Sequence, residues 1–215
     1  MKSEKELQAE WRLAFEQVPT PNNLVSIPEA DFKVNIARDR ELYEQLGMTG
    51  DYFSLQVTGE TLEALYQVKD KLPADEQLGI ISAYRPSDLL LGLWLRRMRT
   101  VQAQFPEWPI EKRIEFGSNY TASPYHPGFP PHARGDSVDV MLYRGGESVV
   151  LNKSAETPEL MYEQMAFDFF KGKDDVIHSN RLHLQEFMTS AGFIPYEREF
   201  WHFGLTPVFP EVKNE

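Results

Sequence analysis

The segment PHARGDSVD, residues 131–139, decides most about this chain, because it joins a histidine in a stiff loop to the start of a strand. His132 follows two prolines, whose rings restrict the backbone, and Gly135 permits a sharp turn. Residues 137–143 alternate polar and apolar side chains, which predicts a strand. Asp139 lies within that strand, where a carboxylate among apolar neighbours is costly unless it is paired or bound to a metal.

Two interpretations of Asp139 are open at this point. For a lone aspartate, an ion pair with an arginine is the more common outcome. The metal interpretation gains support from a second segment, EFWH at residues 199–202, which supplies His202 and, three positions earlier, Glu199. Asp136 is a competing carboxylate, but its place beside a glycine suits a turn residue better.

Two imidazoles and one carboxylate are the donor set of a catalytic zinc site that keeps a fourth position for water. His132, Asp139 and His202 supply this set, and Glu199 is then free to accept the proton of the water. The pattern predicts metal-assisted hydrolysis with one Zn²⁺ per chain. In a regular strand, positions three apart point to opposite faces, so a bend or bulge near Phe200 is needed to bring Glu199 and His202 toward one metal.

The composition favours one globular domain over residues 1–215. Apolar residues make up 41%, enough for a packed core. The net charge of −11 disfavours nucleic acid and anionic membranes as partners, and the absence of cysteine excludes disulfides and thiol nucleophiles. No signal-peptide core or membrane-spanning run is present, so we expect a cytoplasmic protein without a membrane partner. The sequence gives no oligomeric state.

Helical and strand patterns are interleaved irregularly along the chain. Helices are expected at 3–18, 58–72, 87–104 (capped by Ser87 or Asp88), 156–170 and 179–190, and strands within 24–36 and at 78–84, 137–143, 193–196 and 200–205. Residues 1–23 are an N-terminal helix and breaker, and 105–131 are expected to be a long loop. Without a sustained strand–helix–strand rhythm, the prediction is an α+β fold whose central sheet is mostly antiparallel and flanked by helices.

Three ordered motifs within residues 79–210 resemble those of zinc D-alanyl-D-alanine dipeptidases of the VanX type and the related D,D-carboxypeptidases of the VanY type. The family patterns Ser-x-His-x-x-Gly-x-Ala-x-Asp, Glu-x-x-His and Gly-Tyr-Arg-Pro correspond to PPHARGDSVD at 130–139, to EFWH at 199–202 and to AYRP at 83–86. The family serine is Pro130 here, so a substrate contact from that hydroxyl is lost. The resemblance implies the D-Ala-D-Ala peptidase fold, which is of the hedgehog type.

The resemblance also implies a role for each matched residue. His132, Asp139 and His202 would bind zinc. Glu199 would be the general base, and Arg85 would hold or polarise the substrate near the scissile carbonyl, although an arginine at a helix start is otherwise a common structural ion pair. FDF at 167–169 resembles the segment whose acid meets the free amino group of a dipeptide, which assigns Asp168 to substrate binding.

The expected activity is hydrolysis of D-Ala-D-Ala or a similar dipeptide from the cell wall. One alternative is a D,D-carboxypeptidase or peptidoglycan endopeptidase that acts on stem peptides. A second alternative is a non-catalytic binding module of the same fold. The presence of Glu199 argues against the last, because a module without activity can lose its general base freely.

Overall fold

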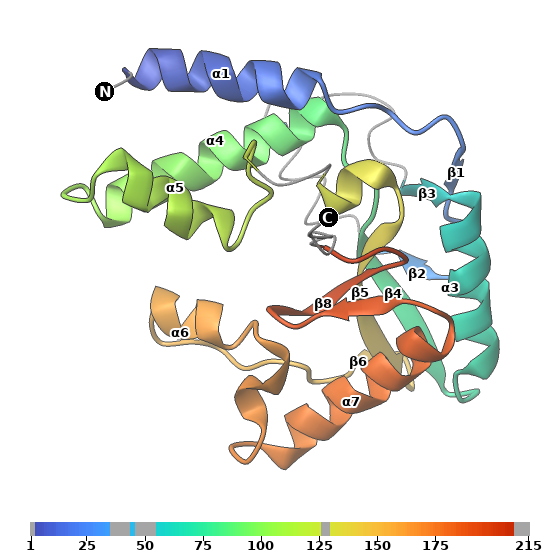
Figure 1. The fold of residues 1–215 in the computed structure, drawn as a ribbon. Coiled ribbons are helices and arrows are strands. Elements are labelled where there is room, and N and C mark those ends of the chain that lie inside the picture. Colours follow the sequence, from blue (N-terminus) through green and yellow to red (C-terminus); the bar gives the residue numbers. More distant parts are fainter. Residues whose placement is uncertain (1–2, 35–43, 46–54, 126–129, 209–215) are drawn as a thin grey trace, which may run out of the picture.

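A mixed sheet runs through the centre of the molecule (Figure 1). The structure is a computed structural model that describes residues 3–34, 44–45, 55–125 and 130–208. The six strands are β2 (Lys33–Val34), β4 (Glu76–Ser82), β5 (Ser137–Arg144), β6 (Glu147–Ser148), β7 (Ile194–Tyr196) and β8 (Glu199–Gly204). Their order is β2-β4-β5-β8-β7, and β6 pairs with β5. Among the described strands, β2 and β4 are parallel and the other pairs of this sheet are antiparallel, which confirms the predicted α+β class.

The main core lies between this sheet and two helices, α3 (Gly59–Lys71) and α7 (Asp175–Ser190). Val138, Val140 and Leu142 are fully buried and share one face of β5, as the alternation of its sequence predicted. A two-stranded sheet of β1 (Leu24–Ser26) and β3 (Gln56–Thr58) precedes α3. Because Val138, Val140 and Leu142 point into the main core, the alternate residues of β5, which include Asp139, point toward the other side of the sheet.

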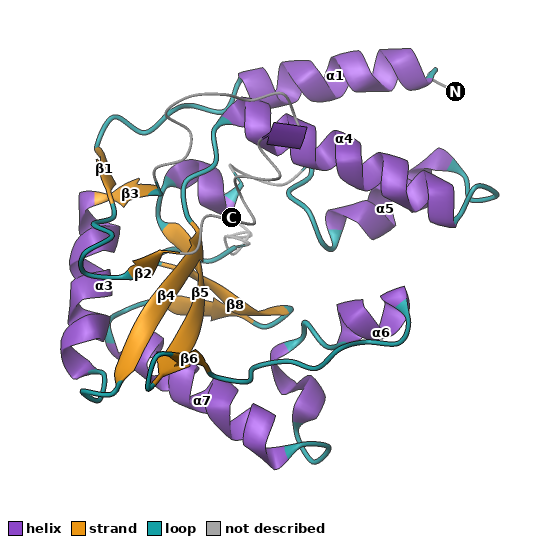
Figure 2. Ribbon diagram, turned by 180° about the vertical axis from the view of Figure 1, so that it is seen from behind, coloured by secondary structure: helices purple, strands orange, loops and turns teal. Residues whose placement is uncertain are grey.

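A second core holds the helices α1 (Glu4–Glu16), α4 (Ser87–Gln104) and α5 (Ile110–Ser118), which lie together in both views (Figures 1 and 2). Trp11 of α1 meets Trp94 of α4 edge to face, with ring centroids 5.6 Å apart. Ser3 and Glu6 form the predicted capping box of α1. No helix among the described residues is long and apolar enough to cross a membrane.

Two predicted elements differ from the structure. Residues 105–131 contain α5, because Ile110 and Ile114 recur at helical spacing and pack on the second core. The helix expected over 156–170 is instead α6 (Pro158–Glu163) followed by the 3₁₀ turn η3 (Phe167–Phe170). The break arises because Arg181 binds the carbonyl oxygens of Gln164 and Ala166, which a continuous helix would use internally.

Helix starts also differ from the predictions at two positions. Neither Ser87 nor Asp88 caps α4: the N-cap residue is Pro86, without a side-chain cap. Helix α7 begins at Asp175 rather than near Ser179, because the side chain of Asp174 accepts a hydrogen bond from the Ile177 N–H and caps the earlier turn. The strands predicted within 24–36 are β1 and β2, and residues 35–36 lie outside the described part of the chain.

Candidate metal centre and active site

His132 is held in one orientation by its local backbone. It lies in the short 3₁₀ helix η2 (Pro131–Arg134), which ends at Gly135 in the left-handed region with φ 71°. A side chain at Gly135 would also collide with Leu24, whose Cδ2 would lie 2.7 Å from the new Cβ. The His132 Nδ1 lies 2.7 Å from the carbonyl oxygen of Ala83. Since a carbonyl can only accept, Nδ1 carries the proton and the lone pair of Nε2 faces the site.

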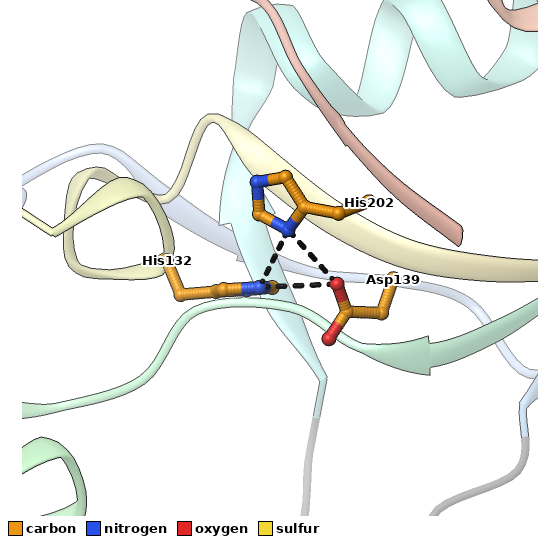
Figure 3. Close-up of side chains that lie close together, drawn as sticks. All are labelled: His132, Asp139 and His202. Atoms are coloured by element: carbon orange, nitrogen blue, oxygen red, sulfur yellow. Dashed lines mark hydrogen bonds and ion pairs between the residues drawn. The ribbon is translucent and has the colours of Figure 1, made fainter. Parts of the chain in front are cut away.

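Three donor atoms meet in a small triangle (Figure 3). His132 Nε2 lies 3.2 Å from Asp139 Oδ1 and 3.1 Å from His202 Nδ1, and the last two atoms are 3.0 Å apart. Asp139 and His202 are direct partners in the β5–β8 pair, so the sheet itself aligns them. With zinc–ligand bonds of about 2.0–2.1 Å, neighbouring donors of a tetrahedral site are about 3.3 Å apart. The triangle thus has the size that one metal ion requires.

The protonation of these groups also suits a cation. Burial, followed by the positive charge of Arg85, lowers the pKa of His132 to about 4, so its imidazole is neutral at pH 7. Burial opposes ionisation of Asp139, but His132 and Arg85 outweigh it and hold the pKa of this carboxyl well below its usual range. Among the described residues, these three side chains form a group that could hold a metal ion. A buried carboxylate and two histidine ring nitrogens fit a divalent ion.

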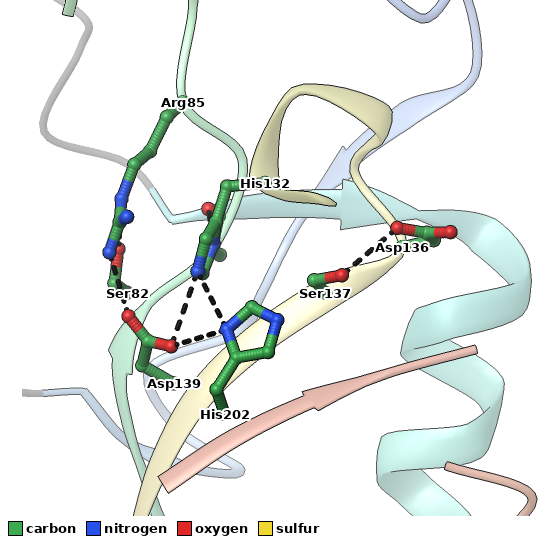
Figure 4. A network of polar contacts seen from close by, with 8 residues as sticks. Ser82, Arg85, His132, Asp136, Ser137, Asp139 and His202 are labelled. Atoms are coloured by element: carbon green, nitrogen blue, oxygen red, sulfur yellow. Dashed lines mark hydrogen bonds and ion pairs between the residues drawn. The ribbon is translucent and has the colours of Figure 1, made fainter. Parts of the chain in front are cut away.

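Arg85 contacts the same aspartate from the other side (Figure 4). Its Nη2 donates to Asp139 Oδ2 at 2.7 Å, and its Nε donates to Ser82 Oγ at 3.0 Å. A register shift between Ile80 and Ser82 places Ser82 opposite Asp139 in the sheet. The ion-pair interpretation of Asp139 is confirmed, because Oδ2 pairs with Arg85. Oδ1 faces the histidines, and metal binding by Asp139 stays a prediction.

Glu199 is the first residue of β8, and its side chain is partly buried. Tyr196 pairs with Glu199 whereas Pro195 pairs with Phe203, so β8 bulges between these two positions. The bulge predicted near Phe200 is confirmed. Burial raises the pKa of Glu199 to about 7, against the opposing influence of His202; the Asp139 carboxylate raises it further, while Arg85 and Arg97 lower it.

Two other carboxylates that the sequence raised, Asp136 and Asp168, are not part of the donor triangle. Asp136 accepts hydrogen bonds from Arg134, Ser137 and Thr206 and thereby closes the turn before β5, as expected for a turn residue. Asp168 is exposed in η3. Its segment is tied to the turn before Glu199, because the N–H of Phe167 donates to the carbonyl of Glu197 at 2.8 Å.

Two further arginines belong to the surroundings of the site and carry no signal in the sequence. Arg181 is buried in α7 and binds the carbonyls of the segment before η3. Arg97 stands in α4 among several arginines of one helix, and only packing distinguishes it from them. Neither has a partner at a fixed sequence spacing, so motif reasoning could not find them.

An α+β domain with a buried His-Asp-His group beside a glutamate and an arginine is typical of a metal-dependent hydrolase. A family model described as D-ala-D-ala dipeptidase matches residues 60–208. The chain belongs to this family of metallopeptidases. It is also 27% identical over 129 residues to a D-alanyl-D-alanine dipeptidase of Escherichia coli (strain K12). That match covers 60% of this chain and 55% of the relative, so it spans about half the length of the relative.

Proposed function

We propose that this chain is a zinc-dependent dipeptidase that hydrolyses D-Ala-D-Ala or a close dipeptide. The observation that carries the proposal is the donor triangle of His132, Asp139 and His202, with Glu199 and Arg85 around it. The family and the similar E. coli dipeptidase support peptide hydrolysis. The resemblance of the motifs supports a peptide derived from the cell wall.

The three donors would hold one zinc ion through His132 Nε2, His202 Nδ1 and Asp139 Oδ1. A zinc ion supplies Lewis-acid polarisation and lowers the pKa of a bound water to about 7. The protein prepares the donors in advance: the Ala83 carbonyl fixes the His132 tautomer, and Arg85 keeps Asp139 ionised. The site therefore needs little rearrangement to bind the ion.

Glu199 moves the proton in the proposed reaction. Its carboxylate takes a proton from the attacking water while the water oxygen bonds to the peptide carbonyl carbon. The C–N bond then breaks, and the protonated Glu199 gives that proton to the leaving amine. A general base works best when its pKa lies near the working pH, and the pKa of Glu199, about 7, meets that condition.

Arg85 has two tasks in this proposal. Through Nη2 it positions Asp139. Its permanent charge would stabilise the carbonyl oxygen of the substrate as that oxygen becomes negative on addition of water. Asp168 is the proposed contact for the free amino group of the dipeptide. Pro130 offers no hydroxyl at the position of the family serine, so the substrate loses one hydrogen bond there.

Two other functions share the site. A D,D-carboxypeptidase or endopeptidase would use the same chemistry on longer peptides, and a binding module would bind a peptide without cleaving it. Zinc-loaded protein incubated with D,D-, L,D- and L,L-dipeptides, and with an N-acylated D-Ala-D-Ala, separates these functions. Cleavage of the acylated substrate alone would exclude the dipeptidase, and no cleavage of any substrate would leave the binding module.

The test of the base uses a matched pair of substitutions. Glu199→Gln should lower turnover by about 10²–10⁴-fold, while bound zinc stays near one equivalent per chain. Glu197→Gln changes an exposed glutamate two residues away and should leave turnover unchanged. Wild-type rates in the Glu199→Gln protein would refute the assigned base.

A further inference from the structure

Arg97 is a guanidinium without an acidic partner among the described residues. Its Nε donates to Thr121 Oγ1 at 3.1 Å, and its Nη1 donates to the hydroxyl of Tyr162. Both partners are neutral, and no ion pair of Arg97 occurs within the described part of the chain. A half-buried positive charge held only by neutral groups is stabilised further when an anion arrives.

Two tyrosines hold this guanidinium in place. The rings of Tyr120 and Tyr162 lie with their centroids 4.2 Å apart and their planes tilted by 30°, and the Arg97 Cζ lies 5.8 Å and 5.2 Å from those centroids. Tyr162 is almost completely buried. The contacts with the two rings and with the Tyr162 hydroxyl limit the rotamers of Arg97, so little conformational entropy is lost when a ligand binds it.

Arg97 lies on the Glu199 side of the site. Arg198, beside Glu199, donates to Asn119 Oδ1 at 2.8 Å, so the turn between β7 and β8 touches the end of α5 next to Tyr120. Figure 1 shows this turn extending toward the side of the molecule where α5 and α6 lie. The charge of Arg97 is near enough to lower the pKa of the Glu199 carboxyl.

The reaction itself puts a negative charge on this side. In a dipeptide, the nitrogen that receives the proton from Glu199 and the free carboxylate belong to the same C-terminal residue. A cation that binds this carboxylate must therefore lie close to Glu199 rather than across the site. Arg85 is already paired with Asp139, whereas no acid among the described residues pairs with Arg97. The net charge of the chain is −11, so the positive charge of Arg97 at this position is opposite in sign to that of the protein as a whole.

We infer that Arg97, supported by Tyr120 and Tyr162, binds the free C-terminal carboxylate of the substrate. This inference rests on the proposed peptidase function and specifies its substrate class. Peptides that end in a free carboxylate next to the scissile bond are selected, and internal bonds of longer chains are rejected. The same site would accept an acidic side chain only if that side chain reached the same position.

The test compares D-Ala-D-Ala with its C-terminal amide, and adds an amidated dipeptide whose second residue is D-Glu. The zinc-loaded wild type should favour the free acid in kcat/KM by about 10- to 100-fold, the range of a hydrogen bond to a charged group. Arg97→Gln should lose that preference, mainly through a higher KM. Arg99→Gln is the matched control, because Arg99 is exposed on the same helix and its Nε donates to the Leu95 carbonyl of that helix.

Arg97→Lys keeps the charge and should recover part of the preference, which a purely structural role would not produce. An Arg97→Gln protein that turns over with the wild-type preference would overturn the inference and leave the peptidase function standing. If the wild type cleaves neither dipeptide, the proposed function fails. Binding calorimetry with the Glu199→Gln variant then still tests the role of Arg97. D-Ala-D-Ala must bind at least tenfold more tightly than its amide to this variant, and the difference must disappear when Arg97→Gln is added. Equal cleavage of the amidated D-Glu peptide would assign the subsite to side chains instead.

Discussion

Arg181 offers a quantitative test of how this fold supports the site. The side chain is 1% exposed, and its guanidinium donates to the carbonyls of Leu151 at 2.7 Å, Gln164 at 2.8 Å, Ala166 at 2.8 Å and Phe167 at 3.2 Å. No carboxylate pairs with it in the described part of the chain. The perturbation is Arg181→Met, which keeps the apolar length and removes every donor.

The magnitude follows from two opposing terms. Hydrogen bonds from a charged donor contribute about 1.5 kcal/mol each at the low end, so four of them contribute about 6 kcal/mol. Burial lowers the pKa of Arg181 to about 10, and this desolvation cost of about 3 kcal/mol disappears in the methionine variant. The net loss is about 3 kcal/mol, a large part of the total of about 5–15 kcal/mol.

The effect should reach the site through Phe200. The Arg181 Cζ lies 3.8 Å from the centroid of its ring, and the Phe200 N–H donates to the Met165 carbonyl at 3.0 Å. Because Phe200 follows Glu199, we expect Arg181→Met to lower kcat as well as stability.

Urea denaturation followed by circular dichroism, at equal zinc, measures the stability change. The melting temperature should fall by roughly 6–12 °C for a chain of this size. Arg181→Lys should fall between the wild type and the methionine variant, because lysine keeps the charge but not the planar fork. A methionine variant within about 1 kcal/mol of the wild type would refute the reasoning, since four buried carbonyls would then need no donor.

Three further predictions concern the metal centre and its base. His132→Ala should reduce bound zinc sharply, as measured by elemental analysis, and unchanged zinc would contradict the ligand set. The kcat/KM should fall as the pH drops through the pKa of Glu199, because protonation removes the base. Since a nearby divalent ion lowers that pKa from about 7, the midpoint of the pH profile should lie below pH 7 with zinc bound. A flat profile from pH 5 to 7 would count against this role. Gly135→Ala should destabilise the chain by about 1–2 kcal/mol and weaken zinc binding, measured by denaturation and by competition with a chelator, because alanine at φ 71° is strained and its Cβ meets Leu24.

Local signals in the sequence were sufficient for most of the fold. The capping box at Ser3, the alternation around Asp139 and the strand pair at the C-terminal end appear where they were predicted. The need for a bulge near Phe200 also followed from residue spacing alone. Errors came where a tertiary contact competes with local preference, as at the segment before η3, where Arg181 takes carbonyls that a helix would use.

The candidate site divides in the same way. Its residue types, order and spacing made His132, Asp139, His202 and Glu199 candidates without any structure, and the structure brings the first three together; their binding of zinc stays a prediction. Only the tertiary structure showed that Arg85 shares Asp139 with the histidines.

The sequence by itself determined the chemistry that this chain could perform, because ligand types and their spacing are written along the chain. The tertiary structure alone decided which arginine pairs with Asp139 and which arginine is buried without an acidic partner among the described residues. It also decided which arginine is near enough to Glu199 to lower the pKa of that carboxyl. The physical reason is that such pairings join residues far apart in sequence. They depend on how helices and strands pack, and the periodicity of the local sequence does not predict which distant residues come together.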